Sequence, residues 1–231
     1  LTSDFEILRG DFARVLFEAT RDDVEYRFGL SVIGLEEQGD GVRVIFDDGS
    51  TDAFALVICA DGLGSSTRSL ALAAETRMRY LGAYMAFFKI PRRPEDDLWA
   101  RSVNGAGGTM INLRPGGPTE TTVLVTFPVG APDLGASTAL SCKDVLRSVL
   151  VGRGTNAERI VDELGAVKDI YFGPLSQVQA STWPKGRLVL PGDAAHCPTL
   201  FTGQGTPIAL MRAYVLAVDS PLSVRITEVF P

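Results

Sequence analysis

The sequence predicts a mixed α/β fold in which a β-rich module interrupts a larger α/β domain. Apolar stretches that end in Asp-Gly and Gly-Asp turns occur in the first and last parts of the 231-residue chain, and such turns are typical of strand ends in α/β sheets. Between them, β-rich runs alternate with Pro/Gly turns. We therefore expect residues 1–77 and 176–231 to form one domain and residues 78–175 to form a β-sheet domain inserted into it.

The composition is that of a globular protein with an acidic surface. Hydrophobic residues make up 45% of the chain and its net charge is −6, so the chain can fill a sizeable core and offers no basic stripe for a phosphate backbone. Nucleic acid is therefore excluded as a partner. The longest apolar run, residues 53–60, is far shorter than the about 18 residues that span a bilayer, and no signal-peptide pattern is present. We expect a cytoplasmic protein without membrane contact; its oligomeric state is not predicted.

The cysteines and the histidine argue against a disulfide framework, a zinc site and a histidine-rich metal site. The three cysteines are widely spaced, without a Cys-x-x-Cys pair, and we expect Cys59, Cys142 and Cys197 to be packing residues. His196 is the only histidine, which excludes a histidine-rich metal site. We expect His196 to stabilise a turn, with a role as a base as the alternative.

The first segment predicts a helix, a hairpin and a buried strand. Apolar residues at helical spacing predict a helix that begins near Asp11 and buries one face. Alternating residues around an Asp-Asp-Gly-Ser turn predict a hairpin that leads to a buried strand at 54–60. This strand ends at Asp61-Gly62, and a short helix is expected around 65–74. The apolar residues of the first helix are Phe5, Leu8, Phe12, Val15, Leu16 and Ala19.

The middle segment predicts strands followed by two helices, at 141–151 and 156–165. The last segment returns through a strand and a turn to a helix that starts near Thr206. The middle strands are expected at 84–90, 108–114 and 121–129.

The first turn whose residues suit ligand binding is ADGLGSSTR, residues 60–68. Glycines allow the chain to turn tightly after the strand that delivers Asp61, and Ser65 or Ser66 can cap the following helix. Arg68 can face a phosphate or a carboxylate. The alternative is a capped helix with Arg68 in a surface ion pair.

The second turn is LVLPGDAAHCPTLFTGQGT, residues 188–206. Its strand ends in Asp193, and a carboxylate suits sugar-like hydroxyls. The Gly-Gln-Gly bend leads into a helix with Thr206 as its N-cap and Pro207 in the first turn, so free N–H groups point at an electron-rich or anionic group. The alternative is that Gly203 and Gly205 only permit a bend.

Together, D-G-x-x-S-x-x-R after a strand and G-D-A-A-H followed by G-Q-G-T resemble the class A FAD-dependent monooxygenases, the para-hydroxybenzoate hydroxylase-like family. The resemblance covers essentially the whole chain. It is strongest to the tetracycline-inactivating and related aromatic hydroxylases, through EILRGDFARVL and GQGTPIALMRAYVLA. The family's G-x-G-x-x-G unit, which precedes these motifs, is absent from the 231 residues. The resemblance implies an incomplete FAD-binding Rossmann-like domain with an inserted substrate domain.

The resemblance also implies a discontinuous FAD site. In the family, the arginine that occupies the position of Arg9 contacts the flavin, and the Gly-Asp pair at the turn binds the ribityl hydroxyls. The glycine-rich bend brings helix-start N–H groups to the pyrimidine edge of the flavin ring. The Asp-Gly motif is associated with both flavin and nicotinamide binding. The positions implied here are Arg9, Asp61, Gly62, Arg68, Gly192, Asp193, Gly203, Gln204, Gly205 and Thr206.

The implied activity is the NAD(P)H-dependent hydroxylation of a planar aromatic or polyketide-like molecule. The flavin carries molecular oxygen as a C4a-hydroperoxide, so no catalytic side chain is required. In the middle module, Phe88, Met110, Asn112 and Phe127 are substrate-contact candidates, although core positions of a half-buried sheet have the same pattern. Two alternatives remain open: a non-catalytic binding remnant of this fold, and a flavin reductase built on it.

Overall fold

The computed structural model describes residues 7, 9–130, 141–219 and 226–230. The chain divides into two compact units: Leu1–Arg79 with Gln177–Pro231, here called unit 1, and Tyr80–Ser176, here called unit 2. The divisions fall within two long strands, β6 (Thr76–Pro91) and β10 (Tyr171–Ala180). The expectation of a mixed α/β fold is confirmed.

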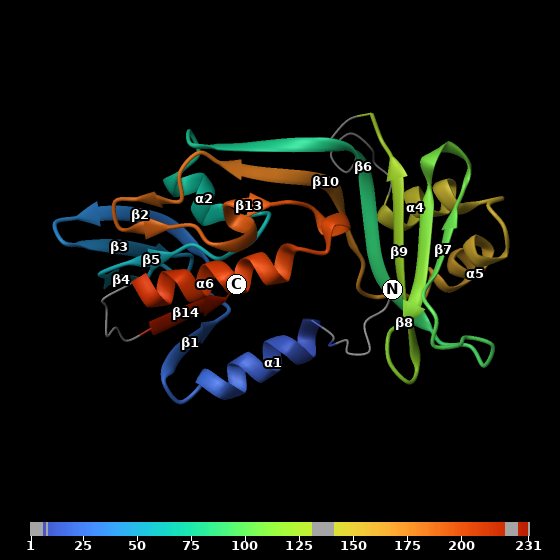
Figure 1. Cartoon of the computed structure of the whole chain (residues 1–231), viewed down its shortest axis with the longest axis horizontal. Helices are drawn as coiled ribbons and strands as arrows, with labels where there is room; N and C mark the ends of the chain where they lie inside the picture. The colour runs from blue at the N-terminus through green and yellow to red at the C-terminus, as the bar shows by residue number, and fades with distance from the viewer. Residues whose placement is uncertain (1–6, 8, 131–140, 220–225, 231) are drawn as a thin grey trace. The chain divides into compact units, whose positions relative to one another are not determined.

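Unit 2 is an antiparallel sheet with two helices against one face (Figure 1). The expected helices form because each has apolar residues on one side and a defined start. The Ser141 hydroxyl accepts a hydrogen bond from the Asp144 N–H, and Gly154 precedes the second helix with φ of +89°. The strands lie in the order β6, β9 (Glu120–Pro128), β8 (Met110–Pro115) and β7 (Arg101–Asn104), and the helices are α4 (Cys142–Leu150) and α5 (Thr155–Glu163).

The core of unit 2 lies between the sheet and these helices. Alternate residues of β6 point into it, because successive side chains of a strand face opposite sides. Leu146, Leu150 and Ile160 of the helices complete the core. The inward residues of β6 are Tyr84, Ala86, Phe88 and Ile90.

The described residues of unit 1 form small sheets and three helices. An antiparallel sheet is built from β2 (Val32–Gln38), β3 (Gly41–Phe46) and β4 (Thr51–Phe54). A second sheet pairs β5 (Val57–Ile58) in parallel with β12 (Leu188–Val189), and β12 pairs with β11 (Pro184–Lys185). Strand β13 (His196–Cys197) pairs with the end of β10, and β1 (Val24–Phe28) pairs with β14 (Ile226–Phe230). The helices are α1 (Arg9–Thr20), α2 (Ser66–Ala71) and α6 (Gly205–Asp219).

Two expectations for unit 1 are wrong in detail. The single buried strand expected at 54–60 is divided between β4 and β5, because β4 pairs antiparallel with β3 whereas β5 pairs parallel with β12. Helix α1 forms, but none of its described residues is buried. On its apolar side, the Phe17 ring meets two aromatic rings of β1, with centroid distances of 4.8 Å to Tyr26 and 6.1 Å to Phe28.

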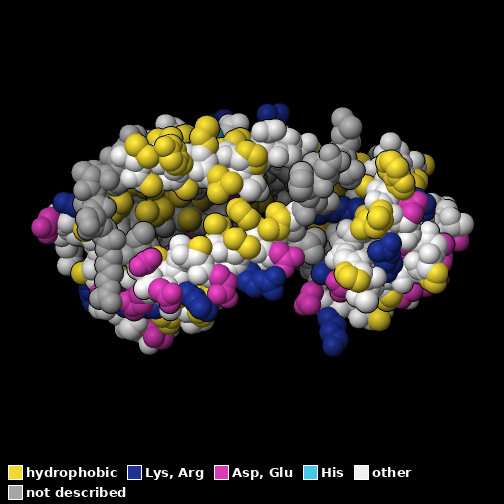
Figure 2. Space-filling view, turned by 60° about the horizontal axis from the view of Figure 1, so that its bottom comes forward, with side chains coloured by type: hydrophobic (Ala, Val, Ile, Leu, Met, Phe, Trp, Pro, Cys, Tyr) yellow, Lys and Arg dark blue, Asp and Glu magenta, His cyan; other side chains and the backbone are white. Residues whose placement is uncertain are grey.

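Helix α6 also exposes apolar side chains. Hydrophobic side chains gather on the face of unit 1 seen in Figure 2. The exposed apolar residues of α6 are Leu210, Met211, Tyr214, Val215 and Val218. In the described ranges, no helix is both long and apolar enough to cross a membrane.

Candidate functional site

The Asp61 carboxylate organises the first turn through hydrogen bonds to the residues that follow it. Its Oδ1 accepts hydrogen bonds from Ser65 Oγ at 2.5 Å and from Thr67 Oγ1 at 2.7 Å, and its Oδ2 accepts from the Thr67 N–H at 3.0 Å. Partial burial opposes ionisation, but these hydrogen bonds outweigh it and lower the pKa of Asp61 below its ordinary value. Asp61 therefore holds the start of α2.

Ser65 is the N-cap of α2, as expected. Its hydroxyl is buried and accepts the Arg68 N–H at 2.8 Å while donating to Asp61. Gly62 has φ of +79°, a conformation that favours glycine. The Asp-Gly-x-x-Ser spacing thus produces a tight, internally bonded turn.

Arg68 joins the first turn to the second. Its side chain donates to the carbonyl oxygens of Gly62 at 3.3 Å and Leu63 at 2.8 Å, and across the unit to Ala194 at 3.1 Å. The residue is only 4% exposed, and burial lowers its pKa. The expected contact of Arg68 with an anion is therefore replaced by contacts with backbone carbonyls, which a planar guanidinium can bridge.

The second turn leaves its carboxylate available. Gly192 has φ of +57° and begins the 3-10 turn η2 (Gly192–Ala194). No hydrogen bond to the half-buried Asp193 carboxylate is found among the described residues. A Cβ placed on Gly205 would lie 3.9 Å from Asp193 Oδ1. The free carboxylate is therefore beside the first residue of α6.

The start of α6 supplies N–H donors to the same place. The helix begins at Gly205, and the Ile208 N–H bonds the Gln204 carbonyl at 3.1 Å. Thr206 therefore lies inside the first turn and is not the N-cap that the sequence predicts. The Gln204 N–H donates to Thr202 Oγ1 at 3.2 Å, and Pro207 has no N–H. The N–H groups of Gly205 and Thr206 remain available to donate to a ligand, because first-turn N–H groups lack acceptors within the helix.

This arrangement fits the ribityl and ring portions of FAD. A free carboxylate suits hydroxyl donors, and a helix start suits a group that gains negative charge. Gly203 has φ of +64°, and no atom lies within 4 Å of where its Cβ would be, so the bend is open to a close approach. Arg9 is exposed at the start of α1. Within the described part of the chain, no hydrogen bond or ion pair joins Arg9 to either turn.

The substrate candidates of unit 2 separate onto two faces of its sheet. Phe88 is 2% exposed and Phe127 is 4% exposed; both lie in the core with α4 and α5. Neither ring has free surface for a substrate, which corrects their assignment as contacts. Met110 and Asn112 lie on the opposite face, where Asn112 Nδ2 donates to Ser102 Oγ at 2.7 Å.

Phe87, which is 36% exposed, shares the open face with Asn112. Phe87 pairs with Leu124, and Leu124 pairs with Asn112 in the next strand. Strand alternation distinguishes Phe87 from Phe88 only once the register is known.

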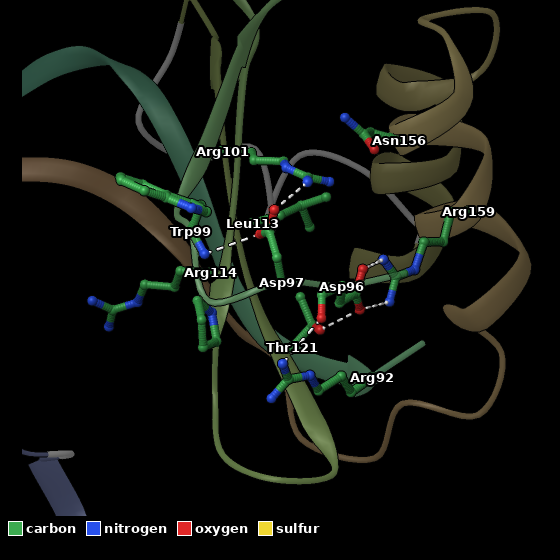
Figure 3. Close-up of a pocket in the computed structure, with 11 residues that line it drawn as sticks. Arg92, Asp96, Asp97, Trp99, Arg101, Leu113, Arg114, Thr121, Asn156 and Arg159 are labelled. Carbon is green, nitrogen blue, oxygen red and sulfur yellow. Dashed lines mark hydrogen bonds and ion pairs between the residues drawn. The ribbon is translucent and has the colours of Figure 1, made fainter. Parts of the chain in front are cut away.

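A polar pocket in unit 2 is structural (Figure 3). Its volume is about 30 Å³, which is space for a single water molecule. Arg159 donates from two nitrogens to the two oxygens of Asp96, each at 2.6 Å. Asp96 Oδ2 also accepts from Thr121 Oγ1 at 2.8 Å and from the Arg93 N–H at 2.9 Å. These hydrogen bonds therefore fix the loop after β6, and the pocket has no room for an aromatic substrate.

Comparison with known proteins defines the family. A family described as "FAD binding domain" matches residues 9–219. The chain belongs to this FAD-binding family. Its relatives include the FAD-dependent monooxygenase asL4 of Sarocladium schorii, which is 32% identical over 94% of this chain and 52% of that protein. The flavin-dependent monooxygenase eupH of a Phoma species is 34% identical over 94% of this chain and 54% of that protein.

Solved structures of the family have the same fold. The tetracycline destructase Tet(51) is 31% identical, with a TM-score of 0.82 over 93% of this chain and 59% of that one. HpxO of Klebsiella pneumoniae, complexed with FAD and uric acid, is 25% identical, with a TM-score of 0.70 over 92% of this chain and 54% of that one. The chain thus spans about half the length of the relatives that it matches. The predicted resemblance to the class A monooxygenases is confirmed.

Proposed function

We propose that this chain holds the flavin ring and ribityl portions of FAD in an FAD-dependent monooxygenase. The enzyme uses NAD(P)H and molecular oxygen to hydroxylate a planar aromatic or polyketide-like molecule. FAD supplies the redox chemistry that activates oxygen and delivers it to the substrate. The relatives named as monooxygenases support the reaction class. The uric acid bound to HpxO and the name tetracycline destructase support a planar substrate.

One observation carries this proposal: Arg68 bonds the Ala194 carbonyl at 3.1 Å and so fixes the two turns to each other. With Asp61 and Arg68 engaged internally, the groups free to bind are Asp193 and the first N–H groups of α6. We assign Asp61, Gly62 and Arg68 as positioning residues. This assignment refines their expected role as direct cofactor contacts.

The free groups have distinct roles in the proposal. Asp193 accepts hydrogen bonds from the ribityl hydroxyls, and Gly192 and Gly203 let the backbone approach the cofactor. The N–H groups of Gly205 and Thr206 stabilise the negative charge that the flavin ring gains on reduction. No side chain is assigned a proton transfer.

The substrate contacts proposed for unit 2 are Met110 and Asn112, on the open face of the sheet. A thioether and a side-chain amide suit a planar molecule with polar substituents, because Met adapts to irregular shapes and Asn can donate and accept. Phe87 adds an aromatic surface on the same face. The face covered by α4 and α5 contributes no contact.

Two alternatives predict different measurements. A flavin reductase would oxidise NAD(P)H and release reduced flavin without oxygenating a substrate. A binding remnant of the fold would bind planar aromatics without FAD. The free carboxylate and the helix start lie together, which favours a protein that binds the cofactor over a remnant. The relatives named as FAD-dependent or flavin-dependent monooxygenases favour the monooxygenase over the reductase.

The experiment is reconstitution of the protein with excess FAD, followed by an activity assay. The proposal predicts bound, protein-perturbed flavin absorbance, and NAD(P)H oxidation accompanied by incorporation of one oxygen atom from ¹⁸O₂ into an aromatic product. Colourless protein after reconstitution, together with no NAD(P)H oxidation, would rule the proposal out. NAD(P)H oxidation with no labelled product from any planar aromatic would favour the reductase.

A further inference from the structure

A second cavity, larger than the pocket of unit 2, lies within unit 1 between the end of β10, strand β13 and the first half of α6. Its volume is about 290 Å³. Gln177 and Val178 of β10 and Pro198 after β13 line one side, and Ile208 and Arg212 of α6 line the other. The groups assigned to the flavin, namely the Asp193 carboxylate and the N–H groups of Gly205 and Thr206, are not among its lining residues.

Two nitrogen atoms buried at this cavity lack partners. Arg212 Nη1 and His196 Nδ1 are both inaccessible to solvent, and neither has a hydrogen-bond partner among the described residues. Each buried polar group without a partner costs about 1–3 kcal/mol, and more when it is charged. A ligand acceptor for these nitrogens would remove that cost.

Stacking holds the Arg212 guanidinium in a fixed orientation. Its central carbon lies 4.1 Å from the centroid of the Trp183 ring, a cation–π geometry. The His196 ring meets Trp183 edge-on at 5.6 Å. Burial lowers the pKa of Arg212, and the charge of Asp193 opposes that shift. Stacking on the Trp183 ring uses the planar face of the guanidinium and leaves its N–H edge available for an anion.

The charge and polarity of the lining residues indicate which kind of anion fits the cavity. The guanidinium already faces the charge of Asp193, so together with a neighbouring imidazole and side-chain amides it suits an anion of no more than one negative charge. Val178, Pro198 and Ile208 offer apolar surface. A doubly charged phosphate would leave charge unbalanced here. A carboxylate matches the guanidinium edge, and an apolar body matches the remaining wall.

We propose that this cavity is a second small-molecule site, which binds an organic monocarboxylate through Arg212 with its apolar body against Val178 and Ile208. The carboxylate accepts from Arg212 Nη1. His196 donates from Nδ1 in the tautomer that carries the proton there. The site is separate from the cofactor site and exists whether or not FAD is bound.

The test uses the 231-residue chain without FAD and benzoate as the probe. His196 is the only histidine and Trp183 is one of two tryptophans, so both report on the cavity. Benzoate is expected to shift the ¹⁵N resonance of His196 Nδ1 and to change the indole signal of Trp183, with saturation. Benzamide, which has the same shape without the charge, is expected to bind at least about tenfold more weakly.

Variants of Arg212 distinguish the loss of its charge from the loss of the fold as the cause of weaker benzoate binding. Arg212→Gln is expected to weaken benzoate binding at least about tenfold, and Arg212→Lys to retain part of the affinity. Arg43→Gln is the matched control, because Arg43 is an exposed arginine of the same unit, paired with Glu36. Amide spectra that overlay on the wild type in regions remote from the cavity establish that each variant is folded.

Three results would show that the cavity does not bind a carboxylate through Arg212. These are benzoate shifts that do not saturate, equal binding of benzoate by Arg212→Gln in its folded state, and equal binding of benzamide and benzoate. Displacement of benzoate by saturating FAD would assign the cavity to the cofactor site and overturn it as a separate site. If Arg212→Gln does not fold, the benzamide comparison and the Arg212→Lys variant decide the question.

Discussion

Arg68 connects turns that are separated by 126 positions in the chain. The sequence motif places an arginine one turn into a capped helix, and from that position alone a surface ion pair or an anion contact is expected. The structure instead gives it three carbonyl partners, one of them distant in sequence. Local pattern predicts Ser65 as a cap because capping is a local interaction. It cannot predict Ala194 as a partner, since that contact depends on how two distant strands pair.

Replacing Arg68 by lysine tests this connection. Lysine keeps the charge but loses the planar fork, so at least one of the two turns loses its donor and a buried carbonyl is left without a partner. We expect Arg68→Lys to lower the free energy of unfolding by about 3 kcal/mol, measured by urea denaturation. Arg43→Lys, at an exposed ion pair, is the control and should change stability by less than about 1 kcal/mol. Equal stability of the two variants would contradict the role assigned to Arg68.

Asp96 predicts a pH dependence of stability in unit 2. Hydrogen bonds from the Arg159 guanidinium hold the pKa of Asp96 well below its ordinary range. Because the folded-state pKa is depressed, the stabilisation is complete above the unfolded pKa of about 3.9 and is lost as the pH falls toward the folded value. The free energy of unfolding should therefore decrease on acidification below about pH 4.

Asp96→Asn should remove part of that acid dependence. It leaves Arg159, whose side chain is 9% exposed, without its counter-charge, and should lower stability near neutral pH by about 3 kcal/mol. Its unfolding free energy should fall less steeply with acid than that of the wild type. Asp97→Asn is the control, since its partner Arg101 is half exposed. An acid slope unchanged by Asp96→Asn would refute the assignment.

At the scale of elements, the helices and strands of unit 2 are predictable because their burial follows periodicity. Helices α4 and α5 begin and end within two residues of the limits expected from apolar spacing. The face of a strand residue is less predictable. Phe88 and Phe127 look like Phe87 in sequence, and the pairing of β6 with β9 decides which ring is covered. For helix α1, periodicity predicts burial that the structure does not show: its spacing predicts a buried face, but none of its described residues is buried.

The cap of α2 gives a prediction at this scale. Ser65→Ala removes the acceptor of the Arg68 N–H and one donor to Asp61, and should lower the free energy of unfolding by about 1–2 kcal/mol. Amide hydrogen exchange in α2 should quicken correspondingly. Ser66→Ala is the control, because Ser66 is exposed and lies 3.4 Å from Asp61. A greater loss with Ser66→Ala would contradict the capping geometry.

At the scale of the whole molecule, the chain belongs to an FAD-binding family and spans about half the length of its matched relatives. Motif order in the sequence is sufficient to predict the family, because two turns of defined composition in a fixed order are more specific than either one. Motif order does not show which residues of the site contact the cofactor and which hold the turns in place. The structure assigns internal hydrogen bonds to Asp61 and Arg68 and leaves Asp193 beside α6 with its carboxylate free.

The most direct test of this account is the affinity of the 231-residue chain for FAD, measured by equilibrium titration, with Asp193→Ala compared against Asp40→Ala in an exposed hairpin turn. The Asp193 carboxylate is expected to accept charge-assisted hydrogen bonds worth about 1.5–3 kcal/mol. Asp193→Ala should therefore bind FAD at least about tenfold more weakly, while Asp40→Ala should match the wild type. Equal affinity of a folded Asp193→Ala variant and the wild type would contradict the central claim that this turn holds the flavin.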